Sequence, residues 1–281
     1  MWMRLAAEDD KLGFLAARLL WATRLCRLIT FALPGGYRMR FYPSAVSTSF
    51  WLDRHFRRGD STLLRRLLRP GATFVDVGAN VGSLSLLAWT RVRPHGRVVA
   101  IEPHPRTYRF LAGNVALNAF AIETYNLAVG HEPGELSFTS LRSDDQNRAR
   151  LPPEHPGTGV RVAVTTLDRL LGDIDVDLLK IDTEGFELHV LAGATETLKR
   201  CTAIYIEDSD RNLRRYGGSS ARLRRTLREA GFLPFRVAGD RAVAVGTTDD
   251  ARAGRGAENL VAIKSDAVDH LLRRGGLVRT A

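Results

Sequence analysis

From residue 73 onward, short apolar segments alternate with helix-like segments, and the turns that follow several of them carry polar side chains. Thr73–Val77 and Val98–Ile101 are two such segments, and Val176–Ile181 and Ala203–Ile206 repeat the pattern further along. Strands that alternate with helices at this spacing form a mostly parallel sheet with helices on both faces. The sequence therefore predicts an α/β fold of the Rossmann-like, doubly wound type, in which ligands bind beyond the carboxyl ends of the strands.

The sequence pattern divides the chain into two parts, which meet near residue 70. Residues 1–70 are expected to form an N-terminal extension of an amphipathic helix, short strands and a helix that starts near Asp60. Residues 71–281 are expected to form the main domain, because the regular alternation lies within them. The further elements predicted there are a helix over Pro105–Asn118, a strand over Ile122–Val129, a polar loop over Arg142–Gly159, a helix that runs to about Lys199, and a terminal strand pair over Ala242–Val245 and Leu260–Lys264.

The charge of the chain is strongly basic, with 41 lysines and arginines against 31 aspartates and glutamates and a formal net charge of +10. An anionic partner and a solvated arginine surface both account for this balance. The two cysteines, Cys26 and Cys201, lie far apart and imply no disulfide framework. A reducing, cytoplasmic compartment is therefore the expectation.

The stretch Leu12–Leu33 is rich in Leu, Ala, Phe and Trp, but three arginines interrupt it. That many charges within about 20 residues argue against a spanning helix. We expect an amphipathic helix that packs on the domain. The alternative is a peripheral membrane contact, with Trp21, Leu28 and Phe31 inserted and the arginines at the headgroups. The arginines are Arg18, Arg24 and Arg27.

A glycine-bearing turn, Asp76-Val-Gly-Ala-Asn-Val-Gly82, follows the first buried strand. Gly78 permits a sharp turn because it has no Cβ, and the helix that begins near Asn80 directs its free N–H groups toward a ligand. Glu102 ends the next strand, where a carboxylate accepts hydrogen bonds from a ribose. These features together indicate a cofactor that contains a nucleoside.

The spacing of the glycines argues against a dinucleotide. Gly78 and Gly82 are spaced G-x-x-x-G, whereas the dinucleotide fingerprint is G-x-G-x-x-G. Asp76 also places a negative charge near the site, which disfavours a diphosphate and suits a cationic sulfonium ligand.

Four motifs in order resemble the FkbM family of methyltransferases, a branch of the class I fold that depends on S-adenosylmethionine. The resemblance covers roughly residues 70 to 210 and is strongest at Asp177-Leu-Leu-Lys-Ile-Asp-Thr-Glu-Gly185 and the following Glu187–Ala194. The other matching segments are Phe74–Gly82, Val99–Pro103 and Thr165–Asp168.

This resemblance implies roles for particular residues. Asp76, Gly78, Ala79 and Asn80 would surround the methionine part of S-adenosylmethionine, Glu102 would hold the ribose hydroxyls, and residues 126–129 would lie beside the adenine. Asp182 and Glu184 would lie where acceptor and cofactor meet. Each is a candidate general base. Alternatively, Asp182 only orients the cofactor's amino group, and Glu184 only caps the helix that follows.

A metal site is an alternative to this arrangement. Asp182, Glu207 and Asp208 follow neighbouring strands, and three carboxylates suit Mg²⁺, which activates the acceptor hydroxyl in some O-methyltransferases of this fold. Carboxylates at strand ends also serve substrate hydroxyls, and we predict no metal.

The resemblance favours an O-methyltransferase that acts on a sugar, a natural product or a lipid-linked small molecule. A nucleic-acid methyltransferase is the second reading, but Asp182-Thr-Glu-Gly185 replaces the Asn/Asp-Pro-Pro-aromatic motif that amino-methylating enzymes carry. Methylation of ribose stays open, as does a non-catalytic nucleotide-binding role. The sequence does not determine the oligomeric state.

Overall fold

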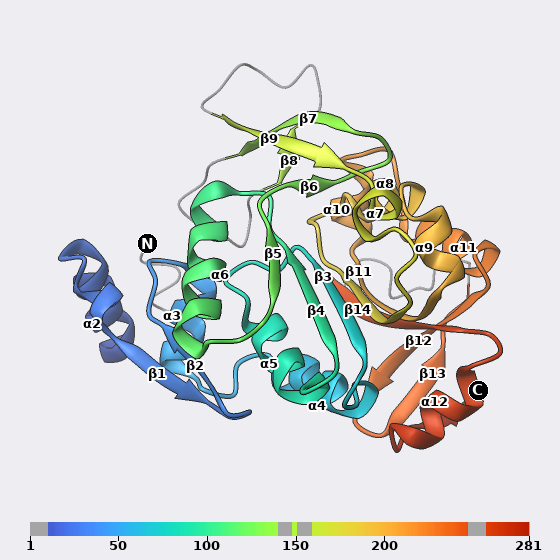
Figure 1. Ribbon diagram of the computed structural model, residues 1–281, viewed down its shortest axis with the longest axis horizontal. Coiled ribbons are helices and arrows are strands. Elements are labelled where there is room, and N and C mark those ends of the chain that lie inside the picture. The colour runs from blue at the N-terminus through green and yellow to red at the C-terminus, as the bar shows by residue number, and fades with distance from the viewer. Residues whose placement is uncertain (1–10, 140–147, 151–158, 247–256, 281) are drawn as a thin grey trace.

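The computed structural model describes residues 11–139, 148–150, 159–246 and 257–280, and its centre is a nine-stranded sheet (Figure 1). The first ten residues of the predicted extension, most of the predicted loop over 142–159, and residues 247–256 and 281 lie outside this description. The strand order is β15-β13-β12-β14-β11-β10-β3-β4-β5. In chain order the strands are β3 (Thr73–Val77), β4 (Arg97–Ile101), β5 (Glu123–Tyr125), β10 (Val176–Ile181), β11 (Cys201–Asp208), β12 (Phe232–Ala238), β13 (Arg241–Ala244), β14 (Glu258–Lys264) and β15 (Val278–Thr280).

The half of the sheet from β5 to β11 is parallel throughout. Its strands run β5-β4-β3-β10-β11, so the order reverses direction between β3 and β10, where an open α/β sheet forms its ligand crevice. The predicted α/β architecture with a mostly parallel central sheet is confirmed.

Helices cover both faces of this sheet because successive strand residues point to opposite sides. Phe74 belongs to a core cluster on one face and Val75 to a second cluster on the other. The first face carries α4 (Arg58–Leu67), α5 (Ser83–Val92), α6 (Pro105–Asn118) and α12 (Val268–Arg274). The second carries α7 (Leu167–Leu171), α8 (Glu187–Ala192), α9 (Thr195–Lys199), α10 (Asp210–Arg214) and α11 (Ser220–Glu229). The helix predicted over Pro105–Asn118 is confirmed, whereas the one predicted to run to Lys199 is interrupted after Ala192.

The N-terminal segment differs from the long amphipathic helix predicted over residues 12–33. Helix α2 ends at Ala22, and the chain then reverses through Arg24, whose backbone is left-handed at φ 62°. In the described residues, no helix is long and apolar enough to cross a membrane. The elements of this segment are α2 (Lys11–Ala22), the 3₁₀ turn η1 (Leu25–Leu28), β1 (Thr30–Leu33), β2 (Tyr37–Arg40) and α3 (Ala45–Leu52).

A second, four-stranded sheet lies above the carboxyl ends of the central strands (Figure 1). Its order is β6-β9-β7-β8, and the single strand predicted over Ile122–Val129 is wrong because this segment contributes to both sheets. The chain leaves the central sheet at Asn126, whose amide donates to the carbonyls of Glu102 and Pro103 at 2.9 and 2.8 Å. The strands are β6 (Ala128–Val129), β7 (Gly134–Thr139), β8 (Ala149–Arg150) and β9 (Gly159–Thr165).

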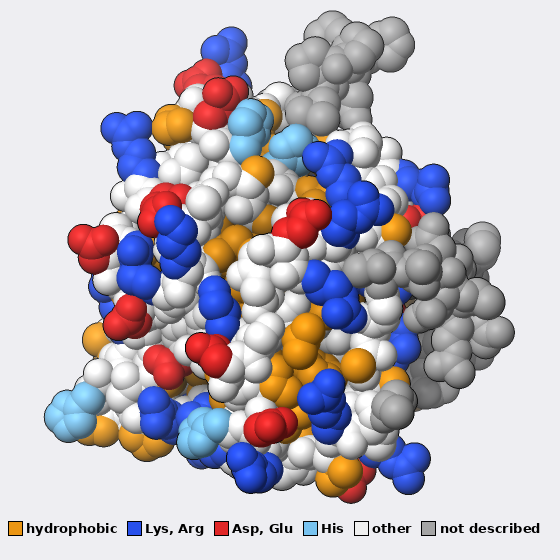
Figure 2. All heavy atoms as spheres, turned by 90° about the vertical axis from the view of Figure 1, so that its right-hand side faces the viewer, with side chains coloured by type: hydrophobic (Ala, Val, Ile, Leu, Met, Phe, Trp, Pro, Cys, Tyr) orange, Lys and Arg blue, Asp and Glu red, His pale blue; other side chains and the backbone are white. Residues whose placement is uncertain are grey.

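The predicted terminal strand pair is also wrong. Strands β13 and β14 are separated by β12, which pairs with both of them in antiparallel register. Strand β12 contains Pro234, and a proline inside an apolar run argues against a central strand. On the face shown in Figure 2, which is the right-hand side of Figure 1, basic and acidic side chains are interspersed.

Candidate active site

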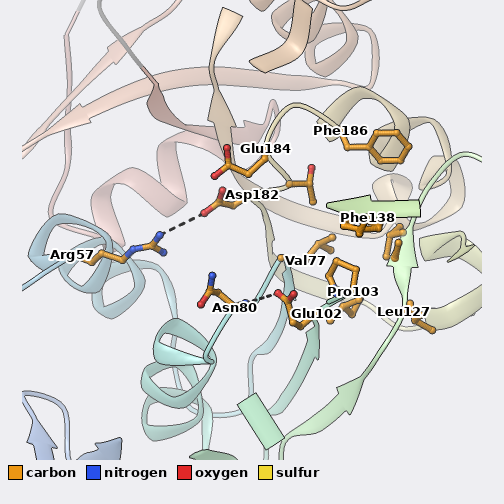
Figure 3. A pocket seen from close by; sticks show the side chains of 15 residues that line it. Arg57, Val77, Asn80, Glu102, Pro103, Leu127, Phe138, Asp182, Glu184 and Phe186 are labelled. Carbon is orange, nitrogen blue, oxygen red and sulfur yellow. Dashed lines mark hydrogen bonds and ion pairs between the residues drawn. The ribbon is translucent and has the colours of Figure 1, made fainter. Parts of the chain in front are cut away.

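A pocket of about 270 Å³ opens where β3, β4 and β10 end, near the lower end of the volumes seen for small-molecule sites. Three turns form its floor, the second sheet closes one side, and Arg57 approaches from the opposite side (Figure 3). Its lining residues are Arg57, Val77, Gly78, Asn80, Ile101, Glu102, Pro103, Leu127, Ala128, Val129, Phe138, Asp182, Thr183, Glu184 and Phe186.

The turn after β3 is held against its neighbours by its backbone. The N–H groups of Gly78 and Ala79 both donate to the carbonyl of Ile101, at 3.0 and 2.9 Å. Gly78 has φ 80°, and a Cβ there would overlap the carbonyl oxygen of Asp182. The glycine is therefore required by close contact with the end of β10, and the expected sharp turn is only part of its role. Ala79 is buried and does not line the pocket.

Glu102 joins the first two turns. One carboxylate oxygen accepts from the backbone N–H of Asn80 at 2.9 Å, and the other accepts from that of His104 at 3.0 Å. The side chain is only 7% exposed, yet it lines the pocket. A carboxylate oxygen offers two lone-pair directions, so Glu102 is able to accept hydrogen bonds from hydroxyls in the pocket while it holds the turn.

Asp76 lies beneath the turn and not on the pocket wall. Its carboxylate is fully buried, and it accepts from Lys180 Nζ at 2.9 Å and from Ser85 Oγ at 2.5 Å. Lys180 also donates to the carbonyl of Gly78 at 3.0 Å. Burial opposes the charge on Lys180, but Asp76 and Asp182 outweigh it and raise its pKa. The charge of Asp76 is thus compensated inside the protein, and this pair fixes the turn from below.

The segment after β10 carries the two candidate bases. Asp182 Oδ2 lies 3.8 Å from Lys180 Nζ and 3.9 Å from Arg57 Nη2, so it faces two cations. Glu184 adopts a left-handed backbone at φ 56° and accepts from Asn212 Nδ2 at 3.2 Å. Both line the pocket, and the structure brings them to the same edge as Gly78, Asn80 and Glu102.

A buried carboxylate that the sequence analysis did not single out shapes this segment. Glu187 Oε1 accepts from the backbone N–H groups of Thr183 and Gly185, at 2.9 and 3.1 Å, and from the Thr183 hydroxyl at 3.0 Å. Burial raises the pKa of Glu187 despite these bonds. Glu187 therefore fixes the loop that presents Asp182 and Glu184.

Two further carboxylates follow at the end of β11. Burial, with Asp182, Glu184 and Glu187 nearby, raises the pKa of Glu207 to about 8. Asp208 points elsewhere, since its carboxylate pairs with Arg224 Nε at 2.7 Å and is buried. Over the described part of the chain, no three His, Cys, Asp or Glu side chains are grouped closely enough to hold a metal ion.

Arg57 and two phenylalanines complete the pocket, and no motif in the sequence pointed to Arg57 or Phe138. Arg57 precedes α4, which begins at Arg58 and not at the predicted cap near Asp60, and its backbone is left-handed at φ 60°. Phe138 comes from β7, and Phe186 stacks on His189 with ring centroids 4.2 Å apart. Burial, with His131 and Arg222 nearby, lowers the pKa of His189, which does not line the pocket.

Comparison with known proteins identifies the family. The model of the methyltransferase FkbM domain matches residues 76–234. Methyltransferase 1 of Beauveria bassiana is 29% identical over 142 residues, which cover 42% of this chain and 57% of that protein. Hexuronic acid methyltransferase AglP of Haloferax volcanii is 26% identical over 178 residues, covering 61% of this chain and 71% of AglP. The 2-O-methyltransferase NoeI of Sinorhizobium fredii is 25% identical over 165 residues, covering 52% of this chain and 67% of NoeI.

The matched part therefore spans little more than half of the first of these relatives. The family match, however, includes the turns after β3, β4 and β10 that form the pocket floor, while Arg57 lies outside it. The predicted family is confirmed: the chain belongs to the FkbM domain family of methyltransferases.

Proposed function

We propose that the protein is an S-adenosylmethionine-dependent O-methyltransferase whose acceptor is a hydroxyl of a sugar or a related small molecule. The observation that carries the proposal is the position of Glu102, a carboxylate on the pocket wall between a glycine turn and an apolar surface. The names of AglP and NoeI support a sugar acceptor, since they describe a hexuronic acid methyltransferase and a 2-O-methyltransferase.

The pocket residues fit this cofactor from one end to the other. Leu127, Ala128 and Val129 offer an apolar surface for the adenine, and Glu102 accepts from the ribose hydroxyls. The turn at Gly78 and Asn80 then borders the path toward Asp182. Asp76 acts here through Lys180, as a positioning residue for the turn. When bound, S-adenosylmethionine supplies an electrophilic methyl group on a positively charged sulfur.

We assign the proton-accepting role to Glu184. Asp182 faces two cations of the protein, which hold its carboxylate in ion pairs, whereas Glu184 lies beside other carboxylates and the amide of Asn212. With the cofactor bound, S-adenosylmethionine would supply the methyl group, and Glu184 would hold the acceptor hydroxyl and take up its proton. Phe138 and Phe186 form an apolar wall that keeps water from this edge.

Transfer of a labelled methyl group to hydroxylated acceptors tests the proposal. The panel contains a uronic acid glycoside, a neutral glycoside and an RNA. Methylation of a glycoside supports the proposal, and salt-sensitive methylation of RNA would replace it with the ribose alternative. Binding of S-adenosylhomocysteine with no transfer to any acceptor favours the non-catalytic reading.

The base is tested in the same assay with Glu184→Gln. General base catalysis contributes about 10²–10⁴-fold, so kcat should fall by at least about a hundredfold while the affinity for S-adenosylhomocysteine stays unchanged. Glu196→Gln is the matched control, because Glu196 is exposed on α9. An unchanged kcat in Glu184→Gln would contradict the assignment.

A further inference from the structure

Arg57 reaches the pocket from outside the part of the chain that matches the family. Its side chain is 28% exposed, and its guanidinium points toward Asp182 (Figure 3). Nη2 lies 3.9 Å from Asp182 Oδ2, and Nε lies 3.9 Å from Asp60 Oδ2. Both separations exceed hydrogen-bond length, so the guanidinium is attracted to these carboxylates while its donors are left for a ligand.

The proposed cofactor orientation determines what reaches Arg57. With the adenine at Leu127–Val129 and the ribose at Glu102, the amino acid part extends past Gly78 toward Asp182 and Arg57. This part ends in a carboxylate and an ammonium group on one carbon atom. The pocket offers a matching cation and anion side by side at this end.

Resting on the proposed function, we propose that Arg57 and Asp182 together bind the zwitterionic end of the cofactor, with Arg57 on its carboxylate and Asp182 on its ammonium group. Arginine suits the first role because its fixed fork of donors matches a carboxylate. The N-terminal extension thereby completes the cofactor site, although it lies outside the family match.

Ligands that differ only in this end test the assignment. S-adenosylhomocysteine carries both charged groups, its decarboxylated analogue keeps only the ammonium group, and 5′-methylthioadenosine has neither. Titration calorimetry is performed with all three ligands on the wild-type protein, on Arg57→Gln and on Arg58→Gln. Arg58 is the matched control, because it is the next residue, is exposed, and does not line this pocket.

We expect Arg57→Gln to weaken binding of S-adenosylhomocysteine by about 10- to 100-fold, the range for a hydrogen-bonded charge. The affinities of the other two ligands should not change, which also shows that the variant is folded. If Arg57→Gln lost the same affinity for all three ligands, the role of Arg57 at the carboxylate would be overturned, but the proposed function would stand. Failure of the wild-type protein to bind S-adenosylhomocysteine would overturn the proposed function together with it.

A second inference stands on a different observation, the apolar surface of the N-terminal segment. Six large hydrophobic side chains are exposed among the described residues, and five of them lie on α2 and η1. These are Leu12, Leu15, Leu19, Leu25 and Leu28, with exposed fractions from 50% to 81%. The other side of α2 is apolar too, since Ala17 is buried and Leu20 and Trp21 pack against the core. A helix that is apolar on both sides is typical of a buried or membrane-bound helix.

The charge of this segment indicates what covers the leucines. Residues 11–52 include six lysines and arginines and no aspartate or glutamate, whereas the face in Figure 2 carries both signs. Arg18, Arg24 and Arg27 are exposed among the leucines, and α2 lies at the outer edge of the molecule (Figure 1). We infer that these five leucines bind the surface of an anionic lipid bilayer. Of the residues that the membrane-contact alternative placed in the bilayer, Phe31 is buried and Trp21 packs against the core, whereas Leu28 is exposed.

Cosedimentation with vesicles tests this surface. The protein should bind vesicles of phosphatidylcholine and phosphatidylglycerol, bind pure phosphatidylcholine much more weakly, and dissociate as salt is raised. The double variant Leu12→Glu/Leu19→Glu should reduce binding by at least about a hundredfold, because two leucines leave the bilayer. Val278→Glu changes the sixth exposed hydrophobic residue, on β15, and should have no effect. Absence of wild-type binding, or equal effects of both changes, would overturn the inference. It would also be overturned if the wild-type protein were a dimer in solution, bound no vesicles, and became a monomer in the double variant, because the leucines would then cover a second copy of the chain.

Discussion

The buried pair of Lys180 and Asp76 gives a prediction that can be worked through in detail. Lys180 is 3% exposed and Asp76 is fully buried, and their charged atoms are 2.9 Å apart. Removing one partner of such a pair leaves an uncompensated buried charge, which costs about 3–5 kcal/mol. Lys180→Met should therefore lower the free energy of unfolding by about this amount, a large part of the stability of a typical domain.

The same variant has a defined pH dependence. The neighbouring carboxylates raise the pKa of Lys180 above its unfolded value of about 10.4. The contribution of Lys180 is therefore complete below this pH and is lost only as pH rises through the folded pKa. At pH 5 and at pH 8, Lys180 therefore makes its full contribution to the stability of the wild-type protein. The deficit of Lys180→Met should therefore be present at both pH values.

Urea denaturation with two further variants measures the effect. Asp76→Asn/Lys180→Met removes both charges and should recover most of the lost stability, since no buried charge is left unpaired. Lys199→Met removes a lysine that is 65% exposed and should cost less than about 0.5 kcal/mol. A cost below about 1 kcal/mol for Lys180→Met, or a double variant as unstable as the single one, would refute the reasoning.

Two other predictions concern the turn after β3 and the carboxylate on β11. In thermal denaturation, Gly78→Ala should lower the free energy of unfolding by about 2 kcal/mol more than Gly36→Ala. Both residues have φ near 80°, but only position 78 lacks space for a Cβ. Equal losses of stability in the two variants would contradict this prediction. Glu207 has a pKa of about 8 in the folded state, above its unfolded value of about 4.3, so its contribution to stability is lost as pH rises between these values. In denaturant titrations at pH 9, Glu207→Gln should therefore stabilise the protein relative to wild type by about 2–4 kcal/mol. At pH 4 the substitution should have little effect. An equal change at both pH values would show that Glu207 does not titrate in this way.

The sequence predicted those site residues that belong to a recognisable local motif. The turn at Gly78 and the carboxylates Glu102, Asp182 and Glu184 each follow a buried strand, and parallel strands bring their carboxyl ends to one edge. The pocket therefore lies where the strand ends were expected to meet.

Features that depend on contacts distant in the sequence were missed. Lys180 sits inside an apolar strand, and only the pairing of β10 with β3 reveals Asp76 as its partner, 104 residues away. Arg57 has no motif around it, and its place depends on how α4 packs on the sheet. Strand β12 was not predicted, and it contains a proline, Pro234, which is unfavourable in a central strand. The break at Asn126 depends on hydrogen bonds to the end of β4.

The central claim is that this pocket binds S-adenosylmethionine through Glu102. Titration calorimetry of S-adenosylhomocysteine, with wild-type protein, Glu102→Gln and the exposed control Glu196→Gln, tests it most directly. The account predicts binding by wild type and control, and a loss of about 10- to 100-fold in Glu102→Gln, with thermal denaturation to check that the variant is folded. Wild-type protein that is folded and binds no S-adenosylhomocysteine, or a folded Glu102→Gln that binds it as tightly as wild type, would contradict the account.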